Sequence, residues 1–251
     1  MTFFDSFDLS TIQWIGVIIV ALLVGFSKTG ISGVGMLNIL LVASIFGGKL
    51  STGIILPMLL VGDVIAVKYY NRHADWHSIK RLIPWALIGI LIGAITGNYI
   101  NDHQFQVLIA IIVLVCLGIL MFSEMKGEDL NVPHKVWFYA LTGIACGFTS
   151  MIGNAAGPIL SIYLLAIGLK KNNFIGTAAW FFFILNLTKM PLQIFVWHNI
   201  NLQTGLLVLV LIPVIVLGAY LGIIVIKKIN ERFFRYIVLS ATLIAAIKLF
   251  F

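Results

Sequence analysis

The stretch Gly25-Phe26-Ser27, which is followed by a polar break and by Gly35, occurs a second time in this chain in altered form. Its copy is Gly147-Phe148-Thr149, again followed by a break and then by Gly157. The two copies lie 122 residues apart, close to half of the 251-residue chain. Recurrence of a long apolar unit at a fixed spacing indicates that the chain is built from two related halves.

A further match extends this repeat toward the end of each half. Ile83-Pro84 returns as Ile212-Pro213 at a spacing of 129 residues. The small change in spacing is what connecting loops of altered length would produce after a duplication. The sequence therefore predicts three parts: a first repeat at 1–123, a linker at 124–135 and a second repeat at 136–251.

The composition is that of an integral membrane protein. Hydrophobic residues make up 61% of the chain, charged residues 10%, and the mean hydropathy is +1.10. A soluble domain is nearer half apolar and a quarter charged. We expect an all-α polytopic fold with eight to ten helical membrane segments, since a spanning helix needs about 20 apolar residues. The apolar segments lie at roughly 12–27, 31–47, 50–70, 80–100, 104–123, 136–152, 155–169, 174–197, 204–226 and 233–250.

The first two segments of each half are short and nearly continuous. The pairs at 12–47 and 136–169 are either two full crossings or re-entrant hairpins whose tips end inside the protein. A full pair crosses the membrane twice and a re-entrant pair does not cross it, so each half makes an odd number of crossings in both cases. An odd repeat places the second half upside down relative to the first, which predicts an inverted repeat.

The positions of the basic residues agree with this inversion. Thirteen of the sixteen Lys and Arg residues fall on one predicted side, whereas the loops around Asp102 and around His198-Asn199 carry almost none. Cytoplasmic loops collect Lys and Arg, so both termini are predicted to be periplasmic. The net charge of the chain is +7, and its basic residues lie between apolar segments. No nucleic-acid partner is therefore expected.

The residue types that support catalysis or metal binding are not grouped in this sequence. Cys116 and Cys146 both fall within apolar segments and are expected to be buried small residues. The five His residues form no ligand motif, and no nucleophile lies beside a base in a membrane segment. We therefore expect no metal, no cofactor and no enzymatic activity.

The two glycine-containing breaks form the candidate binding site. Irregular backbone survives in lipid only when it is buried in protein or faces a water-filled cavity. A new helix begins after each break, and its first N–H groups carry the positive end of the helix dipole. Two inverted copies would aim two helix starts at one point, which is an arrangement that binds anions. The candidate substrate-binding residues of the breaks are Ser27, Lys28, Thr29, Gly30, Ser32, Gly33, Gly35, Thr149, Ser150, Gly153, Asn154 and Gly157.

The alternative interpretation of these glycines is close helix packing, which small residues at regular spacing permit. Gly89 with Gly93, and Gly218 with Gly222, have four-residue spacing and no polar neighbours. For these two pairs, packing is the expected role.

Polar and charged residues inside membrane segments complete the candidate site. A charge in a membrane segment costs at least a few kcal/mol, so it requires a role. Asp63 corresponds to Asn186 in the repeat, and Asn186 shares a helix face with Lys189. Lys28 or Lys189 would neutralise a bound anion; the alternatives are a pair between Lys189 and Asp63, or lysines that extend to an interface. Asp63 is the candidate proton carrier for coupling.

In order and spacing, these elements resemble the sulfite exporter TauE/SafE family, also called the 4-toluenesulfonate uptake permease family. The resemblance covers essentially the full length. It rests on the glycines of the first break, Gly53 with Pro57, the turn Tyr69–Trp76, the series Gly89, Gly93 and Gly97, and the repeat from Gly147 to Gly222. It implies transport of small sulfur-containing or other organic anions across the bacterial inner membrane. The usual glycine run is denser than in this chain, which leaves the substrate open.

We therefore expect a transporter that moves a small anion through the lipid bilayer by alternating access. Proton coupling through Asp63 is a further hypothesis. The alternatives are a passive anion channel and, less favoured, a membrane-embedded enzyme or redox partner. The direction of transport and the oligomeric state stay open at this point.

Overall fold

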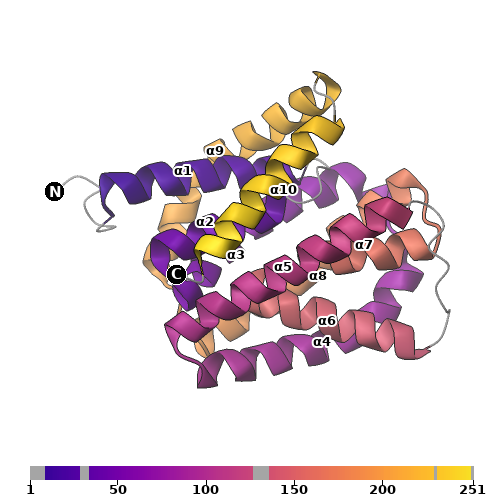
Figure 1. Ribbon diagram of the computed structural model, residues 1–251, viewed down its shortest axis with the longest axis horizontal. Helices are drawn as coiled ribbons and strands as arrows, with labels where there is room; N and C mark the ends of the chain where they lie inside the picture. Colours follow the sequence, from indigo (N-terminus) through magenta and orange to yellow (C-terminus); the bar gives the residue numbers. More distant parts are fainter. Residues whose placement is uncertain (1–8, 29–33, 127–135, 229–230, 250–251) are drawn as a thin grey trace.

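The computed structural model describes residues 9–28, 34–126, 136–228 and 231–249. Within these ranges the chain forms ten α-helices and one short 3-10 helix, with no strand, which confirms the predicted all-α fold (Figure 1). The helices are α1 (Thr11–Ser27), α2 (Val34–Phe46), α3 (Gly48–Tyr70), η2 (Asn71–His73), α4 (Trp76–Tyr99), α5 (Asp102–Lys126), α6 (Val136–Gly153), α7 (Gly157–Ala166), α8 (Lys171–Phe195), α9 (Leu202–Lys228) and α10 (Glu231–Lys248).

Six of the described helices are long and apolar enough to cross a membrane: α3, α4, α5, α6, α8 and α9. In contrast, α2 has 13 residues and α7 has 10. At 1.5 Å per residue they span about 20 Å and about 15 Å, less than the roughly 30 Å of a bilayer core. Neither α2 nor α7 is long enough to cross by itself.

One end of the molecule is formed by the junctions between α2 and α3, α4 and α5, and α8 and α9. The backbone N–H of Gly48 donates to Asp102 Oδ2 over 3.1 Å, and Asn199 Nδ2 donates to the Lys49 carbonyl over 2.9 Å. These contacts join the three junctions, and we call this region the Asp102 end.

The opposite end, called the η2 end, contains the junctions between α3 and α4 and between α7 and α8. The backbone N–H of Asp75 donates to Thr177 Oγ1 over 2.8 Å. Gly176 lies so close to the backbone of Tyr70 and His73 that a Cβ at this position would be within 3.0 Å of it. Two of the junctions predicted from their basic residues to be cytoplasmic, α3–α4 and α7–α8, therefore lie together at the η2 end.

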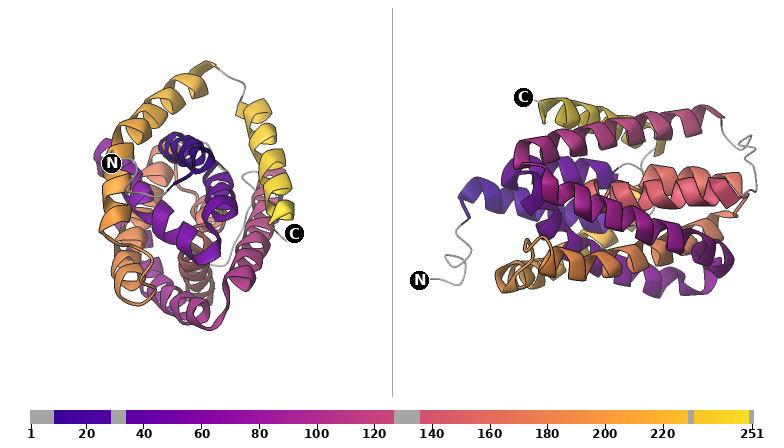
Figure 2. Two further views of the ribbon diagram at one scale, coloured as in Figure 1. Left: turned by 90° about the vertical axis from the view of Figure 1, so that its left-hand side faces the viewer. Right: turned by 90° about the horizontal axis from the view of Figure 1, so that it is seen from below.

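The two helical hairpins enter the molecule from opposite ends. Figure 1 shows α1 starting on the left, on the same side as the α4–α5 junction, and α6 starting on the right. The hairpin of α1 and α2 leads back to the Asp102 end, and that of α6 and α7 leads back to the η2 end. Viewed from the N-terminal side in Figure 2, α1 and α2 lie inside a ring of longer helices.

Close glycine contacts between the halves occur in matching pairs. A Cβ at Gly25 in α1 would lie 1.9 Å from the Ile215 carbonyl oxygen in α9, and one at Gly147 in α6 would lie 1.9 Å from the Ala86 oxygen in α4. Ala86 and Ile215 are separated by the repeat spacing of 129 residues. Each half thus packs its first helix against the fourth helix of the other half. The match supports a two-fold repeat, and its inverted orientation stays a prediction.

The glycines expected to pack helices do so. A Cβ at Gly89 would lie 2.1 Å from the Ile144 oxygen, and one at Gly218 would lie 2.1 Å from the Leu22 oxygen. At Gly93 the nearest atom would be the Cβ of Met151, at 2.9 Å. The packing prediction is therefore confirmed at these three positions.

Candidate substrate-binding site

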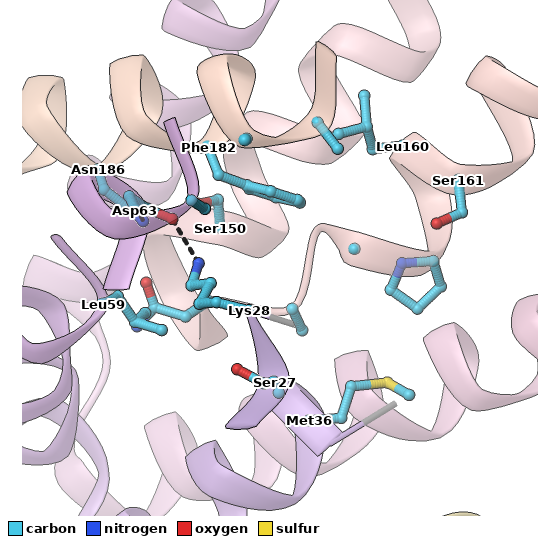
Figure 3. A pocket seen from close by; sticks show the side chains of 18 of the residues that line it. Ser27, Lys28, Met36, Leu59, Asp63, Ser150, Leu160, Ser161, Phe182 and Asn186 are labelled. Carbon is cyan, nitrogen blue, oxygen red and sulfur yellow. Dashed lines mark hydrogen bonds and ion pairs between the residues drawn. The ribbon is translucent and has the colours of Figure 1, made fainter. Parts of the chain in front are cut away.

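A cavity of about 220 Å³ lies where the hairpin tips approach α3 and α8 (Figure 3). Its wall includes Ser27, Lys28 and Gly35 of the first break, and Ser150, Asn154 and Gly157 of the second. At about 30 Å³ per water molecule, its volume corresponds to about seven waters. The described parts of both breaks therefore meet at a space large enough for a small organic anion.

Not every expected site residue lies on this wall. Thr29, Gly30, Ser32 and Gly33 fall outside the described residues. Thr149 does not line the cavity: its Oγ1 donates back to the Ala145 carbonyl over 2.7 Å. Gly153 and Lys189 also lie behind the wall. Asn186 and Asp63 line it together with the break residues.

Lys28 and Asp63 form an ion pair at the cavity (Figure 3). The Lys28 ammonium donates to Asp63 Oδ1, and Asn186 Nδ2 donates to Asp63 Oδ2. The Asp63 side chain is 1% exposed and that of Lys28 is 17% exposed. Lys28 Nζ also lies 5.5 Å from the centroid of the Phe182 ring, a cation–π distance. Two of the alternatives named above do not hold in the structure: Lys28 pairs with Asp63 and does not extend to an interface, and Asp63 does not pair with Lys189.

Lys189 is fully buried and is held by neutral oxygens. Its ammonium donates to the Ser150 carbonyl over 3.0 Å, to Ser150 Oγ over 2.9 Å and to Asn154 Oδ1. An ammonium has three hydrogens, so all its donors are used. Lys189 therefore ties α8 to the junction between α6 and α7, and a direct contact with substrate would require it to release one of these partners.

The contact with Lys189 fixes the orientation of the Asn154 amide. Because an ammonium only donates, the amide oxygen must face it. Asn154 Nδ2 is then left buried without a partner among the described residues. Asn154 also adopts a φ of 49°, in the left-handed region that follows many helix ends, just after α6. Asn154 thus lines the cavity, and its Nδ2 donor is buried beside it without a partner among the described residues.

The charges around the cavity do not cancel. Lys28 and Asp63 compensate one another, whereas Lys189 has only neutral hydrogen-bond acceptors, so its protonated form adds one net positive charge. Charges act more strongly in a poorly solvated interior than in water. An anion in the cavity would supply the missing countercharge.

The second hairpin also presents the start of a helix to the cavity. α7 begins at Gly157 with no side-chain cap, and Pro158 follows directly. Both residues line the cavity. At Gly157 and at its counterpart Gly35, a Cβ would meet no atom within 4 Å. The two glycines therefore leave open space at equivalent positions of the repeat.

Several cavity residues were missed by the sequence analysis. Phe182 and Phe174 of α8 and Ser161 of α7 line the wall, together with aliphatic side chains of α2, α3 and α7. A signal existed for two of them, since Ser161 lies four residues after Gly157 and Phe182 four residues before Asn186. Residues four apart share a helix face.

Comparison with known proteins identifies the family. The model of the family described as sulfite exporter TauE/SafE matches residues 17–249. The chain belongs to this family. Together with the six apolar helices, membership makes it a multi-pass membrane protein of a transporter family.

The curated relatives of this TauE/SafE protein are similar only in part. A probable membrane transporter protein MamO from Magnetospirillum gryphiswaldense is 30% identical over 132 residues, which cover 42% of this chain and 21% of MamO. The MamO of Paramagnetospirillum magneticum is 27% identical over 118 residues, which cover 38% of this chain and 18% of MamO. The matched region is thus about a fifth of each relative's length. No solved structure matches the chain.

Proposed function

We propose that this TauE/SafE protein carries a small organic or sulfur-containing anion, such as sulfite or a sulfonate, across the bacterial inner membrane. The observation that carries the proposal is the position of Lys189, which has no negatively charged partner and lies behind the wall of the cavity. Lys28 lines the same cavity. In a membrane interior such a charge is unfavourable unless a negative partner joins it. A transported anion is a partner of the required sign.

The hydrogen-bond donors at the cavity suit an oxyanion. Ser150 Oγ accepts from Lys189, so its own hydrogen is available to a ligand. Asn154 Nδ2 is without a described partner. Lys28 uses one of its three hydrogens on Asp63, and among the described residues no further acceptor takes the others. A sulfite or sulfonate head has several oxygens that accept such bonds, while Phe174 and Leu160 offer an apolar wall to an organic part.

The proposed mechanism is alternating access, in which the two repeats move against one another around the site. The η2 end is the proposed cytoplasmic side, with both termini periplasmic, in line with the basic residues gathered there. Asp63 is the proposed proton carrier, because protonation of its carboxyl group would release Lys28 to the anion. The alternative of a passive channel is distinguished by counterflow: only a carrier lets a gradient of one anion drive the opposite movement of another.

The first experiment is a thermal-shift screen of the purified protein against sulfite, sulfate, sulfonates and small carboxylates, followed by liposome uptake of each stabilising anion. The informative variant is the double substitution Lys28→Met with Asp63→Asn, which removes the pair without leaving a lone buried charge. We expect it to fold and to lose at least tenfold in anion affinity. Lys170→Met, at an exposed lysine of the η2 end, is the matched control and should bind anions normally. Stabilisation by cations alone, or equal anion binding by the double variant, would contradict the proposal.

A further inference from the structure

The cavity extends from the level of Asp63 and Asn186 toward one end of the molecule. On α3 its lining residues are Leu59, Asp63 and Ala66, in the half nearer the η2 end. On α8 the lining runs from Phe174, near the start of the helix at the η2 end, to Asn186, just past its middle. The structure therefore shows a state whose cavity is displaced toward the η2 end.

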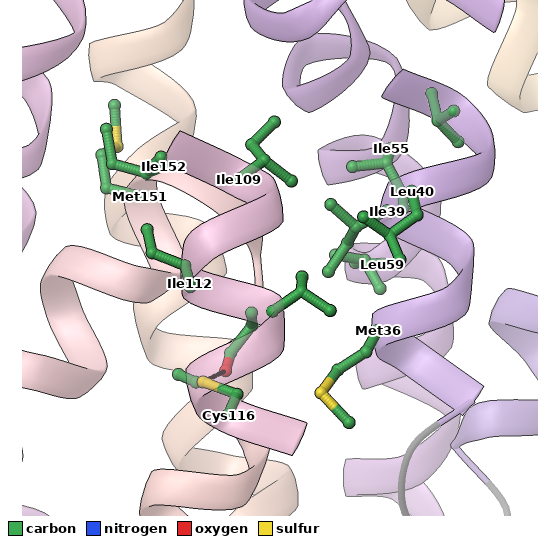
Figure 4. Packing of buried hydrophobic residues seen from close by; sticks show 14 of the residues in the cluster. Met36, Ile39, Leu40, Ile55, Leu59, Ile109, Ile112, Cys116, Met151 and Ile152 are labelled. Carbon is green, nitrogen blue, oxygen red and sulfur yellow. Dashed lines mark hydrogen bonds between the residues drawn. The ribbon is translucent and has the colours of Figure 1, made fainter. Parts of the chain in front are cut away.

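On the other side of this level the interior is packed. Leu40 of α2, Ile55 of α3 and Ile109 of α5 belong to one buried apolar cluster (Figure 4). At the Asp102 end, Asn199 Nδ2 donates to Thr52 Oγ1 over 3.2 Å and to the Lys49 carbonyl. We call this packed region, between the cavity and the Asp102 end, the closed side.

The closed side contains a buried polar side chain that its packing does not explain. Asn38 of α2 is 0% exposed, and neither atom of its amide has a partner among the described residues. Ser51 and Thr52 of α3 are also buried, each 1% exposed, and their hydroxyls donate to the Gly48 and Lys49 carbonyls. Buried amides are almost always hydrogen-bonded in native proteins, so an orphan of this kind requires an explanation.

The internal repeat provides one. Asp63 and Asn186 are equivalent at a spacing of 123 residues, and the same spacing relates Gly53 and Gly176. Gly53 lies against the loop that follows α8, and Gly176 against the loop that follows α3. Helices α3 and α8 are thus equivalent in the repeat, and so are α2 and α7 at a spacing of 122.

If the two halves exchanged their conformations, the repeat counterparts of the present cavity residues would line a cavity on the closed side. Under these spacings, four cavity residues have polar counterparts: Leu160 with Asn38, Phe174 with Ser51, Ile175 with Thr52 and Ala66 with Lys189. All four counterparts are no more than 1% exposed. The orphan amide and the repeat therefore point independently to the same residue, Asn38.

We infer that the substrate path continues through the closed side, lined by Asn38, Ser51, Thr52 and Lys189, and opens when the two hairpins exchange their conformations. The inference rests on the proposed transport function. In the exchanged state Asn38 donates hydrogen bonds to the anion, and the Thr52 hydroxyl turns from the Lys49 carbonyl to the anion. Lys189 leaves Ser150 to supply the positive charge. Lys28 and Lys189 would then serve the same anion from opposite sides of the membrane.

Helix geometry is consistent with a continuous path. On α3, Thr52 lies seven residues before Leu59 and eleven before Asp63, which places all three on one helix face. On α2, Asn38 lies one turn after Gly35, and on α8, Lys189 lies one turn after Asn186. The proposed residues thus continue the faces that already line the cavity.

The test is cysteine accessibility in oriented liposomes, with Cys116→Ala and Cys146→Ala as background. A membrane-impermeant maleimide is applied from each side to variants that carry one new cysteine. Ser161→Cys should react only from the η2 side. Asn38→Cys and Thr52→Cys should react only from the opposite side, and their rates should change at least fivefold when a transported anion is added. Ile90→Cys, at a core position of α4 that is 1% exposed, is the control and should not react.

Two outcomes would overturn the inference: both closed-side cysteines react from the same side as Ser161→Cys, or both stay as unreactive as Ile90→Cys. The two positions on different helices guard against a single misfolded variant. Sidedness can be measured without knowing the substrate. A correct sidedness pattern in a protein that no anion stabilises would refute the proposed function and leave the path in place.

Discussion

The reciprocal glycine contacts predict that two distant substitutions have the same effect. Gly25→Ala and Gly147→Ala would each place a Cβ 1.9 Å from a backbone oxygen of the neighbouring helix. Real Cβ contacts are essentially never shorter than 3.0 Å, so the backbones must separate by at least 1.1 Å, the difference between these distances. The obstacle is backbone, and no side-chain rotation relieves it.

The loss of stability that a displacement of this size causes can be estimated. Overpacking a well-packed interior destabilises by about 1–3 kcal/mol. A gap of 0.5–1 Å also removes about a quarter to a half of the attraction of each contact that it opens. We therefore expect each variant to lose about 3 kcal/mol or more, and the two losses to be similar because the α1–α9 and α4–α6 crossings are equivalent.

The measurement is thermal unfolding in detergent, followed by tryptophan fluorescence. Gly118→Ala and Gly205→Ala are matched controls, since a Cβ at either position meets no atom within 4 Å. Alanine is favoured over glycine in helices by about 1 kcal/mol, so these controls should be neutral or slightly stabilised. If Gly147→Ala behaves like the controls, or if only one of the two crossing variants is destabilised, the assignment of equivalent crossings is refuted.

Three further predictions concern the cavity. Asp63→Asn leaves Lys28 without its partner; we expect a loss of about 3–5 kcal/mol in stability, a larger stabilisation by anions, and liposome uptake that no longer responds to a pH gradient. Full retention of that response would exclude Asp63 as proton carrier. Lys189→Met removes the positive charge behind the wall and frees Asn154, so it should weaken anion binding at least tenfold; unchanged affinity in thermal-shift titrations would contradict both roles of Lys189. Gly157→Leu should fold normally and exclude larger sulfonates while it still binds sulfite, and equal loss of both ligands would argue against its place on the wall.

The sequence was sufficient to predict the class of protein and the meeting of the two breaks at one site. The apolar composition and the paired glycines predicted a helical membrane protein, and the structure brings Lys28 and Asn154 to one cavity. The partners of the charges could not be predicted. Spacing shows that Asn186 and Lys189 share a helix face, but it does not show that one turn of this face meets Asp63 and the next meets the α6–α7 junction.

The ends of the short helices also could not be predicted from the sequence. An apolar segment was expected at 155–169, whereas α7 ends at Ala166. Gly168 adopts a φ of 72°, the left-handed conformation that commonly terminates helices, and the chain turns there toward α8. Apolar character continues through such a turn, so hydropathy alone overestimates the length of the helix. The aromatic wall was missed for a related reason, because apolar residues are common everywhere in this chain.

The two halves share a scaffold but differ in their charges, and this difference constrains the coupling. In the first half the lysine lies in the break and its acceptor, Asp63, lies on the long helix. In the second half the lysine lies on the long helix and its acceptors, Ser150 and Asn154, lie in the break. A symmetric site would hold two carboxylates, whereas the counterpart of Asp63 is Asn186, which does not titrate. If protons are carried at this depth, the proposed mechanism therefore allows at most one proton per transport cycle, a ratio that measured reversal potentials in liposomes would test.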